Sequence, residues 1–442
     1  MLQADTLIEA RWVIPVAPRG AVLENAAVVV SQGRIEAILP IEEARARYEA
    51  AERFSLPASA LLPGLVNLHS HAAMNLLRGR GADLPLMDWL TKSIWPAEGR
   101  LMSEEFVREG SWLAGLEMAA GGVTTASDQY FFPGAAARGL REAGLRCAVA
   151  GLVIGFPSAW GANDDEYLAK AEALLEEFRG DAFVRATVGP HAPYTVSDAS
   201  LRRCAALSEK YGAPVHIHVA ETAGEVSESL EKHGVRPLER LARLGLLNER
   251  LISVHSVHIN DENVAMLARA RASVCHCPAS NLKLASGFAP VAKLLAAGVN
   301  LGLGTDGAAS NDSLDLLGDA RLAAMLAKAV SGDPTAAPVH AILEAATLGG
   351  ARALHWDGEI GSIEAGKRAD LFAVELSSPE ALPVADPAAQ VLYAAGRSRV
   401  THTWVEGGLI ARRDPGLSWS LPDARERAVG IAEKWRARLA AL

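Results

Sequence analysis

Residues 61–71 read LLPGLVNLHSH, an apolar run that ends in two histidines separated by a single residue. A short apolar run beside a Pro-Gly turn is typical of a buried strand. Side chains two residues apart on a strand project to the same face, so we expect His69 and His71 to point the same way. Two imidazoles on one face suit a metal ion, although packing or surface histidines explain many such pairs.

The same unit recurs through residues 62–305: an apolar run that ends in a polar residue, then a Gly- or Pro-marked turn, then a helical pattern. Eight alternating units with continuously apolar strands favour an α/β fold, a (β/α)8 barrel of the TIM type. An open doubly wound sheet is the alternative, but no G-x-G-x-x-G motif follows the first strand. The seven further runs are GVTTASDQYF (122–131), RCAVAGLVIGF (146–156), VRATVGPHAPY (184–194), APVHIHVAET (213–222), RLISVHSVH (250–258), ASVCHCPASN (272–281) and VNLGLGTDG (299–307).

The two ends of the chain differ from the middle, because both carry short β-type runs with Gly turns. We expect residues 1–57 and 360–442 to form one small composite β-sandwich domain with a C-terminal packing helix. Residues 58–359 are then the catalytic barrel. The stretch of 76–105 is too long for a simple turn, and we expect it to lie over the barrel mouth and contact the substrate.

Composition excludes several classes of protein. The chain has 43 Lys and Arg against 52 Asp and Glu, a net charge of -9, which is the wrong sign for a nucleic-acid partner. No signal peptide and no run of about 18 apolar residues is present, so we expect no membrane association and a cytoplasmic location. Four cysteines are too few for a disulfide framework, and we expect Cys275 and Cys277 to be buried in a strand rather than bound to a metal.

Chemically active side chains recur at the ends of other predicted strands. They are His218 and Glu221 near the end of the fifth run, His255 in the sixth and Asp306 at the end of the eighth. Because the C-terminal ends of barrel strands meet at one face, we expect these groups to lie near His69 and His71. Three neutral imidazoles, one carboxylate and a water molecule suit Zn²⁺, and Fe²⁺ is the alternative.

Two of these positions are ambiguous by spacing. His216 lies on the same strand face as His218, and the residue nearer the strand end is favoured as the functional one. His258 follows His255 by three residues and falls in a polar turn. We expect His216 to be a hydrogen-bonded histidine of the barrel core and His258 to lie at the surface.

Eight motifs, taken in order, resemble the amidohydrolase superfamily and, within it, the 5'-methylthioadenosine/S-adenosylhomocysteine deaminases. The resemblance covers nearly the whole chain and implies a barrel with a composite β domain and one zinc ion per chain. The motifs are PGLVNLHSHAAMNLLRG, DWLTKSIWPAEGRL, GPHAPYTVS, HIHVAET, VHSVHIND, HCPASNLKLASG, LGTDGAASNDSLD and GSIEAGKRADL.

The resemblance also assigns roles to residues. The metal ligands that it implies are His69, His71, His218 and Asp306. Glu221 and His255 would be an acid/base pair, and Asp306 would also act as a base. Glu98, nine residues after Trp89 in the W-x8-E loop, would hold the ribose hydroxyls, and His191 would face the purine and sugar. The implied substrate is therefore a purine nucleoside that loses its 6-amino group as ammonia.

Several alternatives stay open. Relatives that favour S-adenosylhomocysteine carry arginines after the third barrel strand, where this chain reads GFPSAWGANDDEYL, so 5'-methylthioadenosine or adenosine fits better. Guanine, 8-oxoguanine and triazine hydrolases share the one-metal pattern. Two-metal amide hydrolases are disfavoured, because the fourth strand carries no lysine. A non-catalytic binding protein would be expected to have lost ligands. A homo-oligomer is an open alternative to a monomer.

Overall fold

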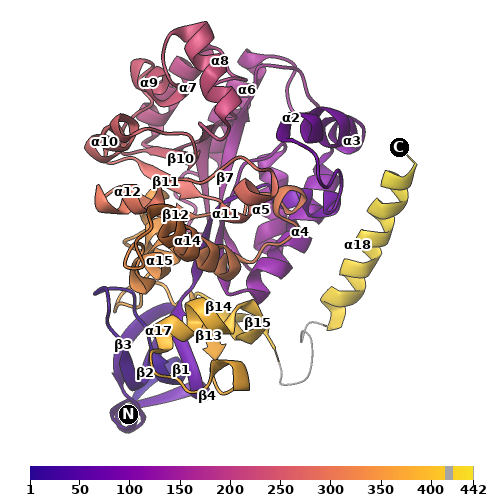
Figure 1. The fold of residues 1–442 in the computed structure, drawn as a ribbon. Coiled ribbons are helices and arrows are strands. Elements are labelled where there is room, and N and C mark those ends of the chain that lie inside the picture. Colours follow the sequence, from indigo (N-terminus) through magenta and orange to yellow (C-terminus); the bar gives the residue numbers. More distant parts are fainter. Residues whose placement is uncertain (414–421, 442) are drawn as a thin grey trace.

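Two β-sheets form the framework of the protein, and Figure 1 shows the barrel sheet above the smaller mixed sheet. The computed structural model describes residues 1–413 and 422–441. The barrel sheet has eight parallel strands in sequence order, which confirms the predicted fold and all eight predicted runs. These strands are β5 (Leu65–Ser70), β6 (Val123–Asp128), β7 (Arg146–Val153), β8 (Val184–Pro190), β9 (Val215–Val219), β10 (Leu251–His255), β11 (Ser273–His276) and β12 (Asn300–Leu303).

The barrel strands are buried almost throughout, as expected for parallel strands covered by helices on the outside and packed side chains within. Strands β9 and β10 pair without interruption, and His218 on β9 lies opposite Val254 on β10. The chain after β12 closes the ring, because the Asp306 N–H donates to the His69 carbonyl at 3.0 Å. Cys275 and Cys277 are buried and form no disulfide, as predicted.

Helices surround the barrel, and several of them begin at a polar side chain that caps the helix N-terminus. Asn163, Ser197, Thr222 and Asn260 each accept a hydrogen bond from the backbone N–H three residues ahead. The helices that follow the strands are α4 (Glu104–Ala120), α5 (Pro133–Glu142), α6 (Asp164–Glu177), α7 (Asp198–Tyr211), α8 (Ala223–His233), α9 (Pro237–Arg243), α10 (Asp261–Ala270), α11 (Pro278–Lys283), α12 (Val291–Ala296), α13 (Ala308–Asn311), α14 (Leu316–Ser331), α15 (Val339–Glu344), η3 (Ala345–Gly349) and α16 (Gly350–Ala353).

The long stretch after β5 forms short helices, and several of its side chains line the cavity described below. These helices are η1 (Ala72–Leu77), α2 (Leu86–Trp89), η2 (Leu90–Ile94) and α3 (Trp95–Leu101).

The second sheet combines both ends of the chain, as predicted. It has the strand order β15-β14-β13-β4-β1-β2-β3, and a single residue, Gly64, separates its strand β4 from the barrel strand β5. The division at residues 57 and 360 stays a prediction. The elements are β1 (Leu2–Val13), β2 (Leu23–Ser31), β3 (Arg34–Pro40), α1 (Ile41–Arg47), β4 (Tyr48–Pro63), β13 (Leu371–Glu375), η4 (Pro379–Ala381), α17 (Pro387–Ala389), η5 (Gln390–Ala395), η6 (Arg397–Arg399), β14 (Val400–Val405) and β15 (Gly408–Arg412).

A buried arginine joins the two sheets. Arg146, the first residue of β7, is 1% exposed and donates to Asp370 and Glu406 of the smaller sheet, each at 3.0 Å. Such a buried pair holds its geometry because either partner alone would be a buried, uncompensated charge. This clamp of Arg146, Asp370 and Glu406 lies at the N-terminal end of the barrel strands, away from the ends that carry the histidines.

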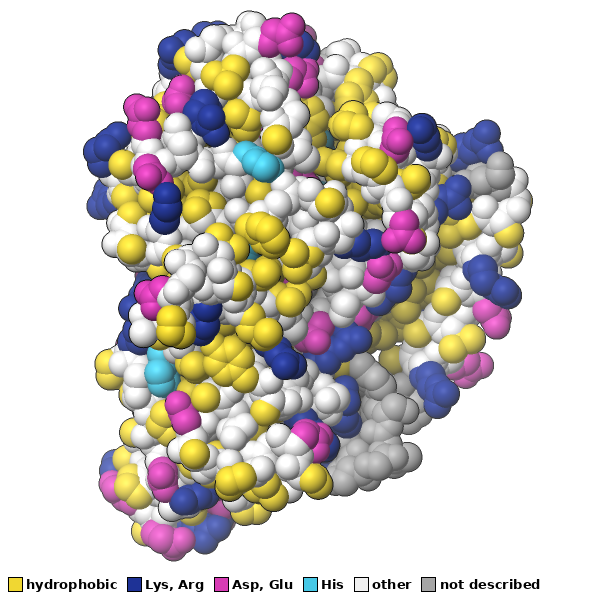
Figure 2. Space-filling view, in the orientation of Figure 1, with side chains coloured by type: hydrophobic (Ala, Val, Ile, Leu, Met, Phe, Trp, Pro, Cys, Tyr) yellow, Lys and Arg dark blue, Asp and Glu magenta, His cyan; other side chains and the backbone are white. Residues whose placement is uncertain are grey.

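The predicted C-terminal helix, α18 (Pro422–Ala440), packs on the barrel beside α4 (Figure 1). Trp435 is 1% exposed, its ring meets that of Phe106 at 4.9 Å, and its indole N–H donates to Glu109 at 2.6 Å. Among the residues that the structure describes, no helix is long and apolar enough to cross a membrane. Figure 2 shows basic and acidic side chains interspersed on one face of the molecule.

Candidate metal and active site

Four side chains converge at the C-terminal end of the barrel. His69 Nε2 lies 3.2 Å from His218 Nε2 and 3.4 Å from Asp306 Oδ1, and His71 Nε2 lies 3.3 Å from the same oxygen. Ligand atoms about 2.0–2.1 Å from a tetrahedral metal are separated by about 3.3–3.4 Å. The cluster therefore has the spacing that a single metal ion requires. His255 also comes within reach of His69 and His218 in this cluster.

Hydrogen bonds leave the Nε2 atoms of these histidines free to bind a metal. The Nδ1–H of His71 donates to the Gln129 carbonyl at 2.6 Å, and that of His218 donates to the His191 carbonyl at 2.7 Å. A backbone carbonyl only accepts, so the proton must be on Nδ1 and the lone pair on Nε2. Burial lowers the pKa of His69 to about 4 and holds the pKa of His218 well below its ordinary value. Both rings are thus neutral at pH 7, as metal ligands must be.

The structure distinguishes the two members of each histidine pair, His216/His218 and His255/His258, that spacing left ambiguous. His216 lies deeper in the barrel, where its Nε2 is 2.8 Å from Nδ1 of His69 and its Nδ1 is 3.3 Å from the Ser127 hydroxyl. It therefore supports His69 from behind, as expected of a core histidine. His258 is partly buried and its Nε2 lies 2.6 Å from the Ser286 carbonyl, so the expectation of a surface histidine is wrong. The loop after α11 covers it.

Asp306 is held in an unusual backbone conformation at the end of β12. Its φ is +61°, in the left-handed region, where a residue with a side chain is strained. Its Oδ1 accepts from the Gly307 N–H at 2.8 Å, and its Oδ2 accepts from the Ser280 hydroxyl at 2.6 Å. Burial raises the pKa of Asp306, but its contacts with the surrounding histidines, His69 and His71 above all, lower it by more, so the pKa of this carboxyl lies well below its ordinary value.

Glu221 and His255 lie beside the cluster, with Oε2 of Glu221 3.7 Å from Nε2 of His255. Burial raises the pKa of Glu221, which favours its protonated form. Nδ1 of His255 lies 2.9 Å from Asn281 Oδ1. The backbone N–H groups of Ala220 and Glu221 donate to the buried carboxylate of Glu225, both at 2.8 Å, which fixes the turn that carries Glu221.

A cavity opens beside these groups. It is lined by His71, Trp89, Glu98, His191, Glu221, Asp306 and mostly apolar side chains. Glu98 on α3 accepts from the Tyr130 hydroxyl at 2.5 Å, and burial raises its pKa to about 7. Nδ1 of His191 lies 2.9 Å from the Thr195 hydroxyl. Eight of the nine predicted site residues line this cavity, and the ninth, His69, belongs to the histidine cluster described above.

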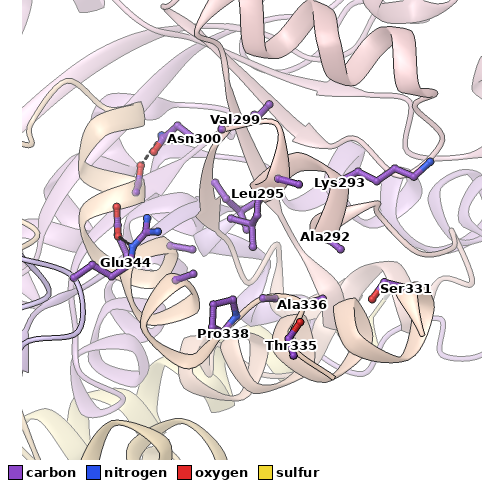
Figure 3. A pocket seen from close by; sticks show the side chains of 18 of the residues that line it. Ala292, Lys293, Leu295, Val299, Asn300, Ser331, Thr335, Ala336, Pro338 and Glu344 are labelled. Carbon is purple, nitrogen blue, oxygen red and sulfur yellow. Dashed lines mark hydrogen bonds and ion pairs between the residues drawn. The ribbon is translucent and has the colours of Figure 1, made fainter. Parts of the chain in front are cut away.

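A second pocket lies at the other end of the barrel, near Asn300, the first residue of β12 (Figure 3). Three of its charged side chains already bind one another, because Glu344 accepts from Arg19 at 2.6 Å and from Arg352 at 2.5 Å. Active sites of such barrels sit at the C-terminal ends of the strands. The histidine cluster, and not this pocket, is therefore the candidate site.

Comparison with known proteins agrees with this geometry. The model of the Amidohydrolase family matches residues 60–410. A protein of Teredinibacter turnerae named 5-methylthioadenosine/S-adenosylhomocysteine deaminase is 40% identical over 437 residues, 99% of this chain and 98% of its own. A protein of the same name from Saccharophagus degradans is 43% identical and covers 93% of this chain and 92% of its own. The chain belongs to the amidohydrolase family.

Solved structures are also similar to this chain. A structure described as an adenosine deaminase from Xanthomonas campestris with bound zinc is 46% identical, with a TM-score of 0.96 and complete coverage of both chains. An atrazine chlorohydrolase from Arthrobacter aurescens is 23% identical with a TM-score of 0.88, covers 97% of this chain and all of its own, and shares the fold. This amidohydrolase is a hydrolytic deaminase, and its barrel carries a histidine-rich candidate metal site.

Several residues of this amidohydrolase's site were not predicted from the sequence. Gln129 and Tyr130 follow β6 directly, so the strand-end argument applied to His218 would have found them too. Ser280 and Asn281 lie inside α11, where no strand-end signal marks them. Glu225 stands three residues after the capping Thr222, a position that usually indicates only a helix start. Its bonds to the Glu221 turn depend on tertiary contacts that the spacing does not contain.

Proposed function

We propose that this deaminase removes the 6-amino group of 5'-methylthioadenosine or adenosine, with one divalent metal ion held by His69, His71, His218 and Asp306. The observation that carries the proposal is the separation of 3.2–3.4 Å between the ligand atoms of these four residues. Further support comes from the neutral imidazoles and from the zinc named in the Xanthomonas campestris structure. Zn²⁺ fits this donor set best, and Fe²⁺ is the second choice.

The metal would supply nucleophilic hydroxide at neutral pH by lowering the pKa of a water molecule. The side chains then move the protons. Asp306 takes one proton from the attacking water, whose oxygen forms a bond to C6 of the purine, while protonated Glu221 donates to N1. The C6–N6 bond breaks after Asp306 passes its proton to the amino group. Ammonia leaves, and the remaining hydroxyl proton returns to Glu221 as the 6-oxo purine forms.

His255 has the geometry to steady the attacking oxygen. Asn281 accepts from its Nδ1–H, which leaves the Nε2 lone pair directed toward Glu221 and the metal cluster. An acceptor at this position holds a proton of the incoming water and so orients its oxygen toward C6.

Glu98 supplies the contact to the ribose. It lines the cavity, and a carboxylate can accept hydrogen bonds from two vicinal hydroxyls at once. Its Tyr130 partner leaves one oxygen uncommitted. His191 and the aromatic face of Trp89 complete the surroundings proposed for the purine and sugar.

The 5' substituent would meet an apolar wall. Trp95 and Phe156 line the cavity with their ring centroids 5.7 Å apart. No Lys or Arg is among the described residues that line it. A buried carboxylate without a cationic partner is costly, so the homocysteine tail of S-adenosylhomocysteine is disfavoured and a methylthio or hydroxyl group is preferred.

A substrate panel tests this function. The metal-loaded protein is incubated with 5'-methylthioadenosine, adenosine, S-adenosylhomocysteine, guanine, 8-oxoguanine and a chlorotriazine, and ammonia or chloride release is followed. We expect the highest kcat/KM for the first two compounds and at least about a tenfold lower value for S-adenosylhomocysteine, because its carboxylate lacks a partner worth about 1.5–3 kcal/mol. Turnover of guanine or the triazine alone would overturn the assignment.

A further inference from the structure

One short segment touches all three groups to which the proposed reaction assigns proton transfer or orientation of the water. It comprises α11 and the turn that follows it, residues 278–286, and we call it the α11 segment. It contacts Asp306, His255 and Glu221, which come from three different barrel strands. None of its own side chains is a predicted metal ligand. A different residue of the segment contacts each of the three groups.

The first contact is between Ser280 and Asp306. The Ser280 hydroxyl is fully buried and donates to Asp306 Oδ2 at 2.6 Å, while Oδ1 of Asp306 faces His69 and His71. The two oxygens therefore have separate partners. A hydroxyl bound to Oδ2 fixes the rotation of the carboxylate about its Cβ–Cγ bond, which keeps Oδ1 directed at the imidazoles.

The second contact is between Asn281 and His255. Asn281 is 1% exposed, and its Oδ1 lies 2.9 Å from Nδ1 of His255. An amide oxygen accepts, so it selects the His255 tautomer with the proton on Nδ1 and the lone pair on Nε2. The backbone of His255 has a left-handed φ of +68°, so the ring is held in place from both ends.

The third contact is between Ser286 and Glu221, whose Oε1 accepts from the Ser286 hydroxyl at 3.3 Å. The turn itself is fixed, because the Ser286 N–H donates to the Asn281 carbonyl at 2.9 Å and the Ser286 carbonyl accepts from His258. The two ends of the α11 segment are thus linked. A displacement at one contact would be transmitted to the others.

The segment is also anchored to the outer helices. The Ala279 N–H donates at 3.0 Å to Asp319 on α14, a carboxylate that is 2% exposed and also accepts from Asn311 at 3.1 Å. This anchor connects the α11 segment to a long helix that takes no direct part in the site. The segment can therefore hold the three groups against a rigid support.

We propose that the α11 segment is the positioning element of this site, in which Ser280 orients Asp306 and Asn281 sets the tautomer and orientation of His255. The inference rests on the proposed function, because it explains how groups assigned to that reaction are held. Ser280 and Asn281 act through their partners and have no contact of their own with the substrate. Their effects are consequently separable: Ser280 governs a metal ligand, whereas Asn281 governs a group beside the metal.

Four substitutions test this assignment: Ser280→Ala, Asn281→Ala, Asn281→Asp and, as the matched control, Leu282→Ala. Leu282 lies between these residues and Lys283 on the same helix, but it is 38% exposed and lines no part of the cavity. For each metal-loaded protein we would measure kcat, KM, the melting temperature and the zinc affinity by competition with a chelator. The substrate is whichever panel compound the unmodified protein converts fastest.

Asn281→Ala should lower kcat by about 10- to 100-fold with KM, melting temperature and zinc affinity little changed. Asn281→Asp should recover kcat to within about tenfold of the unmodified protein, because a carboxylate also accepts from Nδ1–H. Ser280→Ala should weaken zinc binding by about 10- to 100-fold as well as lower kcat. Leu282→Ala should match the unmodified protein.

Three results would overturn the inference: full kcat in Asn281→Ala, equal loss in Asn281→Ala and Asn281→Asp, or unchanged zinc affinity in Ser280→Ala. A failure of the proposed function looks different. In that case the unmodified protein would convert no nucleoside of the panel, while the ratios among the variants on another substrate, and the zinc affinities, would still decide the role of the α11 segment.

Discussion

Glu98 is a carboxylate that the fold buries with a tyrosine hydroxyl, rather than a cation, as its bonded partner. Burial raises its pKa to about 7, which means that ionising it in the folded protein costs free energy. The proposed contact with the ribose hydroxyls gives a physical reason for keeping a group that opposes folding. Residues placed for function commonly have this property.

Glu98→Gln is therefore expected to raise the stability of the protein and to lower its activity. Between pH 4.5 and 7 the folded state keeps a proton on Glu98 that the unfolded state has released, so the free energy of unfolding falls as pH rises, by at most about 1.4 kcal/mol per pH unit from this group. The Glu98→Gln variant does not undergo this fall in the free energy of unfolding, because an amide does not ionise. Urea unfolding should show the variant to be more stable than the unmodified protein at pH 8, with little difference at pH 4.5.

The same variant should have a kcat/KM lower by about 10- to 100-fold, as expected when a charged hydrogen-bond partner is lost. Equal stability of the two proteins at pH 8 would show that Glu98 is not a buried, destabilising carboxylate. An unchanged kcat/KM would remove it from the substrate site.

Glu221→Gln tests the proposed proton donor. An amide cannot donate an acidic proton to N1, so kcat should fall by about 10²- to 10⁴-fold while the bound metal is retained. Stopped-flow or steady-state ammonia release gives kcat, and metal analysis of the same sample gives occupancy. Glu228→Gln, at a partly exposed position on the same helix as Glu225 and outside the cavity, is the control. Full turnover in metal-loaded Glu221→Gln would contradict the role of Glu221 as proton donor.

Strand β7 carries the clamp between the barrel and the smaller sheet. Arg146 is buried between Asp370 and Glu406, and Arg146→Ala leaves Asp370 buried without its partner. We expect a loss of about 3–5 kcal/mol in the free energy of unfolding. Activity of the folded protein should change little, because the clamp lies at the opposite end of the strand from the site.

Lys210→Ala is the control for that substitution. Lys210 is 59% exposed and pairs with Glu172 at 2.6 Å on the surface, where an ion pair contributes at most about 1 kcal/mol. Denaturant titrations of both variants make the comparison. Similar losses in the two would contradict the role assigned to the clamp.

The strands and their ends could be predicted from the sequence because each barrel strand has a local signal. Continuous apolar runs mark strands buried on both faces, and a histidine at the end of a run marks the barrel mouth, as for His69 and His218. The choice between His216 and His218 was open, because both share a strand face and differ only in depth. Depth depends on how neighbouring strands are staggered, which no local pattern contains.

For a related reason, the sequence could not predict the hydrogen bonds that hold the site residues in place. Ser280, Asn281 and Glu225 are polar residues at helix starts, where capping alone accounts for such side chains. Their partners are 26 residues away for Ser280 and Asn281, and only the closed barrel brings them together. His258 was misassigned on the same basis, because the turn that carries it is covered by the loop after α11.

In the whole molecule, the metal cluster occupies one end of the barrel and the smaller sheet covers the other. The cluster consists of three imidazoles and one carboxylate whose ligand atoms lie 3.2–3.4 Å apart; His69, His218 and Asp306 are buried, and His71 is partly buried. A bound ion would replace the mutual repulsion of their lone pairs by attraction. Removal of metal with a chelator should therefore lower the melting temperature as well as the activity, and added Zn²⁺ should restore both.

The most direct test is a titration of metal-free protein with Zn²⁺, in which ammonia release from 5'-methylthioadenosine is measured at each step. The account predicts negligible release without metal and a linear rise that reaches its plateau at one equivalent of zinc per chain. A plateau at two equivalents, full activity without metal, or no ammonia at any zinc concentration would contradict it.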